Sequence, residues 1–479
     1  MSSSFLFYDL ETFGACPRRS RIAQFAGIRT DSALNPIDDD ICFYVRPADD
    51  LLPSPIASLI TGITPQHACD HGVNEAEAFA RIHDQMMRPG TCSAGYNSLR
   101  FDDEFVRHGL FRNFYDPYER EWRGGNCRWD LLDVMRLAHA LRPDGIEWVY
   151  REDGSPSFTL EGLANANGVR IGDAHEALSD VRALIGLSKR LREAQPRLWD
   201  YCLRLRDKRF AGSLLDVVAM KPVLHVSQRF AASRLCAAPV LPIAMHPRIA
   251  NRVIVFDLGQ NPETLLALDE AAIAARLYVR QDQLPEGVER IALKEVHLNR
   301  CPALVGWDHL RPTDFARLRI DEAQVADRAA RIRLHAPDLA EKIRRVYATH
   351  RDLDPPDCDA SLYDGFIPDD DRARFPRVRT TAPGSLAQAD FGFSDPRLPE
   401  LLFRYRARNW RQTLASHETL RWDAYRRERL ADPARSEYTF ASFHDEIAQL
   451  RSQRAGDGQA CRVLDEVEAW GRALEAELA

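Results

Sequence analysis

Two carboxylates at alternate positions end an apolar run near the start of the chain. Asp9 and Glu11 follow Phe5–Tyr8, a hydrophobic and aromatic run that is typical of a buried strand. Residues two apart on a strand point to the same face, so the two acids are expected side by side. Lys and Arg are absent from their immediate neighbourhood, and adjacent carboxylates repel each other unless a cation lies between them. The pair predicts a site for Mg²⁺ or Mn²⁺; the alternative is a strand end with solvated acids.

Two further acids stand beside apolar positions of expected helices. Asp102 lies three residues before Phe105, so it borders the buried face of its helix. Asp180 lies three residues after Ala177 and four before Leu184, on the core-facing stripe of a later helix. An unpaired carboxylate on such a stripe is costly, so it needs a metal ion, a basic partner or a proton. The alternatives are an acid stabilised by the helix dipole for Asp102 and a buried acid satisfied by backbone groups for Asp180.

His175 stands at the entry to the helix that carries Asp180. Five helical residues turn by about 140°, so these two side chains cannot share a face. A core-anchored Asp180 and a swinging His175 suit a fixed metal ligand and a mobile general base, and an imidazole titrates near neutral pH. The same helical geometry directs Asp103 away from the site. Four acids and one His predict two-metal phosphodiester cleavage, with ions about 3.5–4 Å apart.

Composition limits the classes of protein to be considered. The 479 residues suffice for two or three domains, and the formal net charge of −7 means that a nucleic-acid partner needs a local basic groove. Ten cysteines are scattered without a Cys-x-x-Cys pair, which favours reduced thiols in a cytoplasmic protein. We expect neither a signal peptide nor a membrane span, because the N-terminal residues lack a basic segment and no long uncharged apolar run follows.

The patterns of strands and helices divide the chain into parts. Strands are expected at 5–13, 21–30 and 41–46, followed by alternating helices and strands, which indicates an α/β domain. Short β-rich runs separated by Pro and Gly then indicate a small barrel or sandwich. Helical patterns dominate the C-terminal part. Two local expectations matter below: residues 128–141 as one helix, and Leu277–Val279 as a short strand.

The order Asp-x-Glu, Asp, His-x₄-Asp resembles the proofreading-type 3′→5′ exonuclease superfamily with its His-containing acidic motif (DEDDh). Within that superfamily the chain is most similar to the bacterial exonuclease I family of single-strand-specific deoxyribonucleases. The motifs that carry the resemblance span nearly the whole chain: Asp9–Gly14, Leu59–Gln66, Gly95–Asn97, Arg100–Glu104, Arg112–Tyr118, Arg128–Asp133, Met220–Pro222 and Leu402–Asn409.

The resemblance implies a fold and a set of site residues. The fold is a ribonuclease-H-like exonuclease domain with a mixed sheet (1–195), an SH3-like β-barrel-containing domain (196–350), a linker (351–366) and a C-terminal helical domain (367–479). Asp9, Glu11 and Asp180 are metal ligands, Asp102 completes the acidic set, and His175 is the base. The implied DNA contacts are Arg107, Tyr118, Trp122, Arg136, Asn251, Lys294, Tyr363 and Phe366. Aromatic rings and cations suit single strands, because bases stack on rings while cations follow the backbone.

One position departs from the family pattern. In Ser157–Glu161 the family leads us to expect an Arg that touches substrate, and this chain has Thr159 instead. A cationic phosphate contact is therefore weaker here or is supplied by another residue, with Arg151 and Arg170 nearby in the sequence.

The activity implied is the release of 5′-mononucleotides from the 3′ end of single-stranded DNA, in DNA repair and recombination. Two Mg²⁺ ions are the expected cofactor, with Mn²⁺ as a substitute. The expected partners are single-stranded DNA and the C-terminal peptide of a single-stranded-DNA-binding protein, and the chain is expected to be monomeric. Two alternatives use the same residues: an exoribonuclease or oligoribonuclease, and an inactive protein that holds DNA ends.

Overall fold

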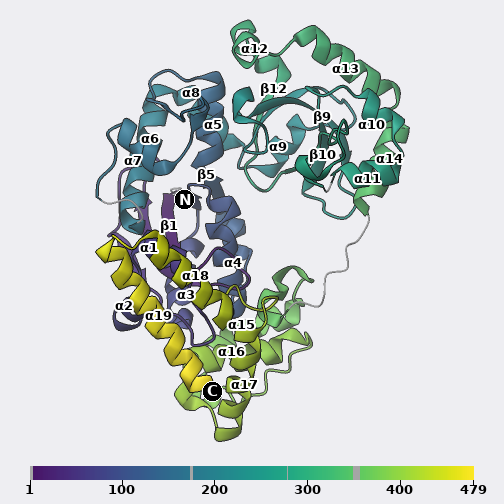
Figure 1. Cartoon of the computed structure of the whole chain (residues 1–479). Helices are drawn as coiled ribbons and strands as arrows, with labels where there is room; N and C mark the ends of the chain where they lie inside the picture. The colour runs from purple at the N-terminus through teal and green to yellow at the C-terminus, as the bar shows by residue number, and fades with distance from the viewer. Residues whose placement is uncertain (1–3, 173–175, 278, 349–356) are drawn as a thin grey trace. The chain divides into compact units, whose positions relative to one another are not determined.

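The computed structural model describes residues 4–172, 176–277, 279–348 and 357–479, which group into two compact units (Figure 1). The first unit takes in Met1–Cys127, Ile171–Ile185 and Leu353–Ala479, and the second takes in Arg128–Arg170 and Gly186–Asp352. In the described part of the chain, no helix combines the length and the apolar character that crossing a membrane requires.

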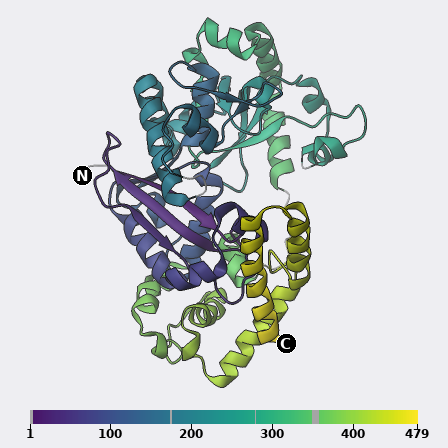
Figure 2. The same cartoon turned by 60° about the vertical axis from the view of Figure 1, so that its left-hand side comes forward.

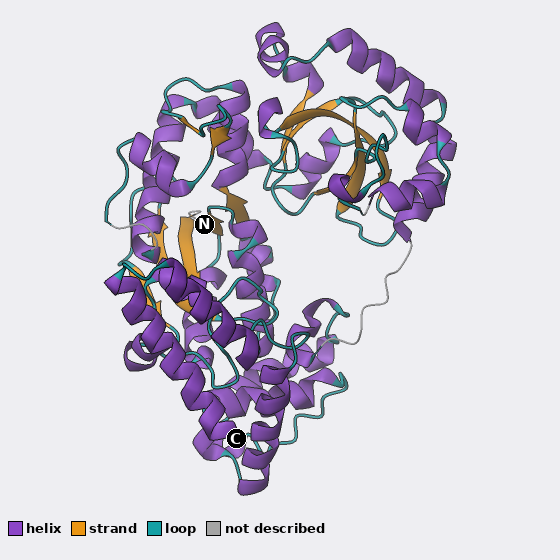
Figure 3. Cartoon of the chain, viewed as in Figure 1, coloured by secondary structure: helices purple, strands orange, loops and turns teal. Residues whose placement is uncertain are grey.

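The first unit is built on a mixed sheet. Its order is β3-β2-β1-β4-β5, with β1 antiparallel to β2 and parallel to β4, and its strands are drawn orange in Figure 3. A parallel neighbour means that the carboxyl ends of β1 and β4 meet at one edge. The strands are β1 (Ser4–Thr12), β2 (Ile22–Thr30), β3 (Ile41–Tyr44), β4 (Thr91–Gly95) and β5 (Cys127–Asp130).

Helices of the N-terminal segment pack on this sheet through large buried side chains. Phe79 of α3 and Phe105 of α4 join Leu6 and Tyr8 of β1 in one core cluster. Gly109 of α4 allows the Phe79 ring to pack against the helix, since a Cβ atom at this position would lie 1.7 Å from the ring. The helical segments are α1 (Pro55–Thr61), α2 (Pro65–His71), α3 (Glu75–Met87), η1 (Ser98–Arg100), α4 (Asp102–Arg112), η2 (Glu119–Glu121) and η3 (Arg123–Gly125).

The C-terminal helices belong to the same unit. Helices α18 and α19 lie side by side and contact α1, as the yellow end of the ribbon shows in Figure 2. Phe443 of α18 packs against Gly471 of α19, where a Cβ atom would lie 2.3 Å from the ring. The elements are η7 (Cys358–Tyr363), α15 (Asp369–Thr380), η8 (Pro383–Ser385), α16 (Arg397–Asn409), η9 (Arg411–Thr413), α17 (Ser416–Ala431), α18 (Phe440–Gln453) and α19 (Gly458–Leu478).

A buried ion-pair network joins the C-terminal helices to the N-terminal segment. The Arg408 guanidinium donates to Asp50 through Nη2 at 2.8 Å and to Asp359 through Nη1 at 2.8 Å. Burial by itself would raise the pKa of both acids, but Arg408 and its neighbouring guanidiniums hold each pKa below its ordinary value. Both carboxylates therefore stay ionised and stabilise the folded chain.

Replacing Arg408 should expose how much this network contributes. Arg408→Ala leaves two buried carboxylates short of their main partner, which should lower the free energy of unfolding by about 3–5 kcal/mol at pH 7. Because the two pKa values are depressed, the native contribution is complete above about pH 4 and fades below it, so the difference should shrink on acidification. Urea unfolding at pH 7 and at a pH below about 4 measures how the difference between variant and wild type changes. Arg81→Ala, which breaks an exposed pair with Glu77, is the control and should cost within about 0.5 kcal/mol. An equal cost in the two variants would contradict the role of the network.

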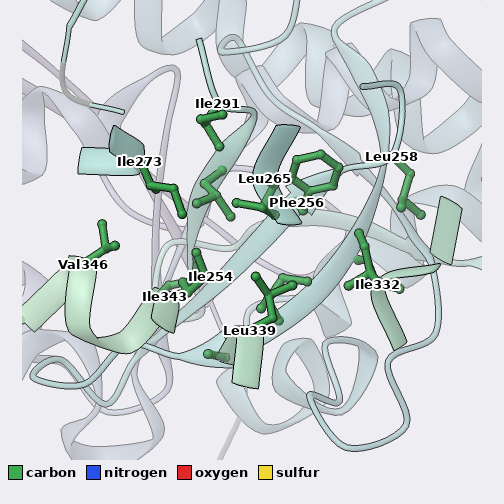
Figure 4. Packing of buried hydrophobic residues seen from close by; sticks show 14 of the residues in the cluster. Ile254, Phe256, Leu258, Leu265, Ile273, Ile291, Ile332, Leu339, Ile343 and Val346 are labelled. Atoms are coloured by element: carbon green, nitrogen blue, oxygen red, sulfur yellow. The ribbon is translucent and has the colours of Figure 1, made fainter. Parts of the chain in front are cut away.

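The second unit contains an antiparallel sheet in the order β11-β10-β9-β8-β12. Ile254 and Phe256 of β10 face Leu265, Leu339 and Ile343 in one apolar cluster (Figure 4). The strands are β8 (Val223–Val226), β9 (Ala237–Met245), β10 (Arg252–Asp257), β11 (Leu293–His297) and β12 (Ala303–Gly306), with a separate hairpin of β6 (Val149–Tyr150) and β7 (Pro156–Ser157).

The second unit also contains helices, and α7 begins in the first unit and ends in the second. They are α5 (Leu131–Leu141), α6 (Leu160–Ala166), α7 (Ala177–Ala194), α8 (Pro196–Arg204), α9 (Lys208–Leu214), α10 (Glu263–Ala267), α11 (Glu270–Leu277), α12 (Pro312–Leu318), α13 (Glu322–Leu334) and α14 (Ala336–Ala348). The 3₁₀ turns are η4 (Ala232–Arg234), η5 (Gln281–Gln283) and η6 (Trp307–His309).

Two local predictions were wrong. Residues 128–130 belong to strand β5, and the helix begins only at Leu131, because the Asp130 carboxylate accepts from the Leu132 amide at 3.0 Å and caps the helix. Leu277 ends helix α11 instead of starting a strand, because it packs with Ile273 of the same helix face into the apolar cluster. A short apolar run does not distinguish the two structures by itself.

Candidate active site

Strand β1 carries the first two acids to the edge where β1 and β4 end together. Asp9 pairs with Ala26 and Glu11 with Gln24 of β2, and the register shifts at Glu11/Thr12. Such bulges bend a strand and re-aim its side chains, and they are common beside active sites. Beyond β4, the turn η1 leads directly into α4, whose first residue is Asp102. The parallel β1–β4 pairing therefore brings Asp102 to the same edge.

Three carboxylates from distant parts of the sequence converge there. Asp9, Glu11 and Asp180 each offer an oxygen atom, and these oxygens lie within 4.8 Å of one another. Glu11 is buried, whereas Asp9 and Asp180 are partly buried. Asp180 lies on the first turn of α7, next to the buried residues Ser179 and Val181. It is thus less deeply buried than its place on the apolar stripe led us to expect.

Burial and mutual repulsion among the carboxylates dominate the electrostatics of the site. Burial raises the pKa of Asp9 well above its ordinary value, and the Asp102, Glu11 and Asp180 carboxylates raise it further. Burial, Asp180 and Asp102 together raise the pKa of Glu11 from 4.5 to about 8. Asp102 itself is buried. The fourth acid is therefore close enough to repel the others, and the cluster demands protons or cations.

A second group of buried residues supports both halves of the acidic cluster. Tyr8, next to Asp9, donates to Asp103 Oδ1 at 2.6 Å, and Arg120 donates to the same oxygen at 2.5 Å. Asp103 follows Asp102 and is 1% exposed. Asp103 thus points away from the acidic cluster, as expected, but it is buried and ties β1 to α4. The sequence signal available was a second acid in the same helical turn, and its partner Arg120 could not be inferred from spacing.

The same unit contains five of the residues that the sequence predicts to contact DNA. Trp122, Tyr363 and Phe366 are exposed by 63%, 44% and 88%. The Tyr118 ring meets the Phe366 ring edge-on at 6.3 Å, and the Arg107 guanidinium lies 5.4 Å from the Tyr118 ring centroid. These contacts and the hydrogen bond from Arg107 to the Tyr363 hydroxyl connect four of the five residues, with Arg107 buried and Trp122 exposed elsewhere in the same unit. His175, the predicted base, lies outside the described residues.

The other predicted contacts lie in the second unit. Arg136 is buried, donates to Asp133 at 2.6 Å and stacks over Phe158. Lys294 of β11 lies 2.9 Å from His225 Nε2 and over the Phe230 ring. Asn251 precedes β10 and is partly buried. Thr159 is exposed and caps α6 without a hydrogen bond from its side chain.

A second cluster of possible metal ligands is already neutralised by arginine side chains. Asp357, Cys358 and Asp359 also offer ligand atoms within 4.8 Å of one another, but Arg404 donates to both acids and Arg408 donates to Asp359. The pKa of Asp359 is held well below its ordinary value. Guanidiniums already neutralise this cluster, so it has no need of a metal ion.

The donor set at the end of β1 fits a hard divalent cation. Oxygen atoms of Asp9, Glu11 and Asp180 are close enough to share an ion, and carboxylates are the ligands that Mg²⁺ and Mn²⁺ prefer. A cation would also remove the repulsion that raises the pKa of Asp9 and Glu11.

Comparison with protein families agrees with this geometry. The model of the family described as "Exonuclease" matches residues 6–187, which contain the complete acidic set. The fold and the site therefore define an exonuclease that depends on divalent metal ions. The models described as "Exonuclease I SH3-like domain" and "Exonuclease I C-terminal domain" match residues 206–349 and 356–474. The chain belongs to the exodeoxyribonuclease I family.

Individual relatives resemble the chain along nearly its full length. Exodeoxyribonuclease I of Escherichia coli K12 is 44% identical over 463 residues, which cover 96% of each chain. The structure of a moderately thermophilic exonuclease I from Methylocaldum szegediense superposes with a TM-score of 0.94 at 47% identity, covering 98% of this chain and 99% of that one. A zinc-bound complex of the E. coli enzyme with single-stranded DNA superposes with a TM-score of 0.93 at 43% identity, covering 98% and 99%.

The raised pKa of Glu11 predicts how metal binding depends on pH. Without metal, the folded protein holds a proton on Glu11 more tightly than the unfolded chain does, and this proton stabilises the fold. The stabilisation is lost as the pH rises from about 4.5 through about 8. Divalent cations bind the ionised carboxylates, so the rise in Tm on adding Mg²⁺ should be small at pH 5.5 and grow up to about pH 8. Thermal unfolding with EDTA or Mg²⁺ measures it. Glu11→Gln should flatten the dependence, and a Tm rise that is equal at all pH values would contradict the assignment.

Proposed function

We propose that the protein is a Mg²⁺-dependent exonuclease that removes 5′-mononucleotides from the 3′ end of single-stranded DNA, in DNA repair and recombination. The observation that carries the proposal is the convergence of Asp9, Glu11 and Asp180 within 4.8 Å, with Asp102 near enough to raise the pKa of its neighbours. Full-length similarity to exodeoxyribonuclease I of E. coli supports the choice of substrate, as does the DNA-bound structure of that relative.

Each side chain of the site has a stated role in this proposal. Asp9, Glu11 and Asp180 hold the divalent ions, and the Asp102 carboxylate completes the negative site that retains them. Two ions, when bound, supply Lewis-acid activation of a water molecule and stabilisation of the leaving oxygen. His175 accepts the proton of the attacking water, since a histidine pKa lies near the working pH. Mn²⁺, which has the same preference for oxygen ligands, should substitute for Mg²⁺.

The DNA contacts proposed are of two kinds. The exposed rings of Trp122, Tyr363 and Phe366 and the partly buried ring of Tyr118 offer faces on which bases stack, which suits a sequence-independent enzyme. Arg136, Asn251 and Lys294 supply polar and cationic groups from the second unit. His225 orients Lys294: its Nδ1–H donates to the Ala303 carbonyl at 3.1 Å, so its Nε2 can accept from the Lys294 ammonium.

End-labelled single-stranded DNA with each end blocked in turn tests the reaction and its polarity. Wild type with Mg²⁺ should release 5′-mononucleotides unless the 3′ end is blocked. Asp180→Ala should lower kcat/KM by more than about 100-fold, because removing a direct ligand costs more than removing an outer partner. Asp40→Ala is the control. It breaks an ion pair with Arg182, which lies on the same helix as Asp180, and it should keep full activity.

Matched RNA strands and direct binding distinguish the alternatives. Faster release from RNA would favour an exoribonuclease. Binding of DNA ends without any release in Mg²⁺ or Mn²⁺ would favour the inactive binding protein. Full activity of Asp180→Ala would refute the mechanism.

Thr159 offers a gain-of-contact prediction. Its hydroxyl makes no capping bond to α6 and its side chain is exposed, so an arginine can replace it without loss of local structure. Thr159→Arg should lower KM for single-stranded DNA and steepen the slope of log KM against log salt by about 0.7, the value for one added phosphate contact. Thr159→Gln is the uncharged control. An unchanged slope in Thr159→Arg would place this residue away from the DNA backbone.

Partners, location and domain limits complete the proposal. The chain acts as a monomer in the cytoplasm and binds the acidic, hydrophobic-ended C-terminal peptide of a single-stranded-DNA-binding protein, which suits an Arg-lined apolar pocket. All ten cysteines are free thiols, which supports a reducing compartment. The division into 1–195, 196–350, 351–366 and 367–479 is supported by the ranges of the three family models.

A further inference from the structure

Three aromatic side chains, Tyr118, Tyr363 and Phe366, form an aromatic platform in the first unit. Tyr363 and Phe366 are 44% and 88% exposed, whereas Tyr118 is partly buried and meets Phe366 edge-on at 6.3 Å. They come from two stretches of chain, 118–122 and 363–366, that are far apart in the sequence. Rings held this open to solvent need support from beneath, because an exposed side chain otherwise samples several rotamers.

Arg107 of α4 contacts two of these rings, and most of its donors are already engaged. Its Nε and Nη2 donate to the two oxygens of Glu121 at 2.7 and 2.9 Å. Its Nη1 donates to Glu104 at 3.1 Å and to the Tyr363 hydroxyl at 3.2 Å. Four contacts engage four of the five N–H groups that a guanidinium carries.

Burial makes this arrangement costly to open. Arg107 is 5% exposed, and the side chains of Glu104 and Glu121 are 12% and 11% exposed. A DNA phosphate that reached the guanidinium would have to displace a buried carboxylate that binds it through both oxygens. Two carboxylates against one guanidinium also leave the cluster with a net negative charge, which repels a phosphate.

The same contacts fix two of the platform rings. The Tyr363 hydroxyl accepts from Arg107 and donates to Glu104, and its ring meets the buried His108 edge-on at 5.8 Å. The guanidinium also lies 5.4 Å from the Tyr118 ring centroid. Arg107 thus contacts a ring from each of the two stretches.

We infer that Glu104, Arg107 and Glu121 are positioning residues, which hold Tyr363 and Tyr118 in place for stacking on DNA bases, and that Arg107 itself does not bind a phosphate. This inference rests on the proposed function, since the platform serves DNA. It gives Arg107 a different role from the direct contact that the family resemblance implies, and it assigns a role to Glu121, which the sequence did not single out.

The two roles for Arg107 predict opposite effects of Glu121→Gln. If Glu121 supports the platform, its loss loosens Arg107 and Tyr363, and DNA binding weakens. If Glu121 instead masks a phosphate-binding cation, its loss frees that cation, DNA binding tightens, and the salt slope steepens by about 0.7.

Binding and turnover of a 5′-labelled oligo(dT) over a range of KCl concentrations test the inference. Kd is measured by anisotropy in EDTA, and kcat and KM are measured with Mg²⁺. Glu121→Gln and Arg107→Gln should each raise Kd and KM by about 10-fold, which is within the effect of one lost base stack. Their kcat should stay within about 2-fold and their salt slopes should equal that of wild type. Tighter binding by Glu121→Gln, or a slope reduced by about 0.7 in Arg107→Gln, would overturn the inference.

A double-mutant cycle isolates the connection to Tyr363. If Arg107 acts in part through that ring, then Arg107→Gln should weaken binding less in the Tyr363→Ala background than in wild type. Additive losses would overturn the inference. Glu121→Asp, which keeps the charge, should recover part of the affinity, and Tyr363→Phe provides a second probe of the hydroxyl contacts if Arg107→Gln fails to fold.

Controls separate this inference from the proposed function. Glu77→Gln breaks an exposed pair with Arg81 on α3 and should bind and turn over DNA like wild type. If wild type itself neither binds nor degrades single-stranded DNA, the proposed function fails. If wild type does both and only the variants behave contrary to expectation, the positioning role alone fails.

Discussion

Repulsion among carboxylates at the end of β1 is the constraint that the active site satisfies. Asp9, Glu11 and Asp180 offer oxygens within 4.8 Å of one another, and Asp102 adds to their repulsion. Such a cluster is stable only with bound protons or cations. The fold holds the acids together through the parallel pairing of β1 with β4 and through the buried contact of Tyr8 and Arg120 with Asp103. The free energy of folding thus maintains an arrangement that metal binding then stabilises.

The same unit shows what burial does to an acid when a guanidinium faces it. Asp50 and Asp359 are more deeply buried than Glu11, yet the pKa of each is lowered while that of Glu11 is raised to about 8. The difference lies in the neighbours, because Arg408 donates to both of the former. Acids neutralised by arginines join parts of the chain to each other, and acids that repel one another are available for a metal ion.

Ion pairs also extend from the catalytic edge toward the aromatic platform. Asp103, Glu104 and Arg107 all stand on the first two turns of α4, directly after Asp102. Asp103 faces Tyr8 and Arg120, whereas Glu104 and Arg107 face Tyr363. Helix α4 therefore presents Asp102 to the metal site. Its next residues support both the metal site and the aromatic platform. These separate roles account for three consecutive acids in the first turn of α4. Acids at a helix N-terminus also suit the helix dipole.

The sequence by itself determined the elements whose signals are local. Alternation of Asp9 and Glu11 on a strand and the apolar spacing around Asp180 follow from backbone geometry, so the acidic residues could be named, and so could the main strands of the mixed sheet. Helix α15 was not anticipated, since Pro376 stands inside it and proline normally ends a helix. The misassigned ends at Leu131 and Leu277 depended on a cap and on a packing partner. Only the tertiary structure decided that Asp103 turns inward to Arg120 and that Arg107 is enclosed by Glu121. Charged side chains reach partners many residues away, and no spacing rule fixes which partner a buried charge finds until the chain is folded.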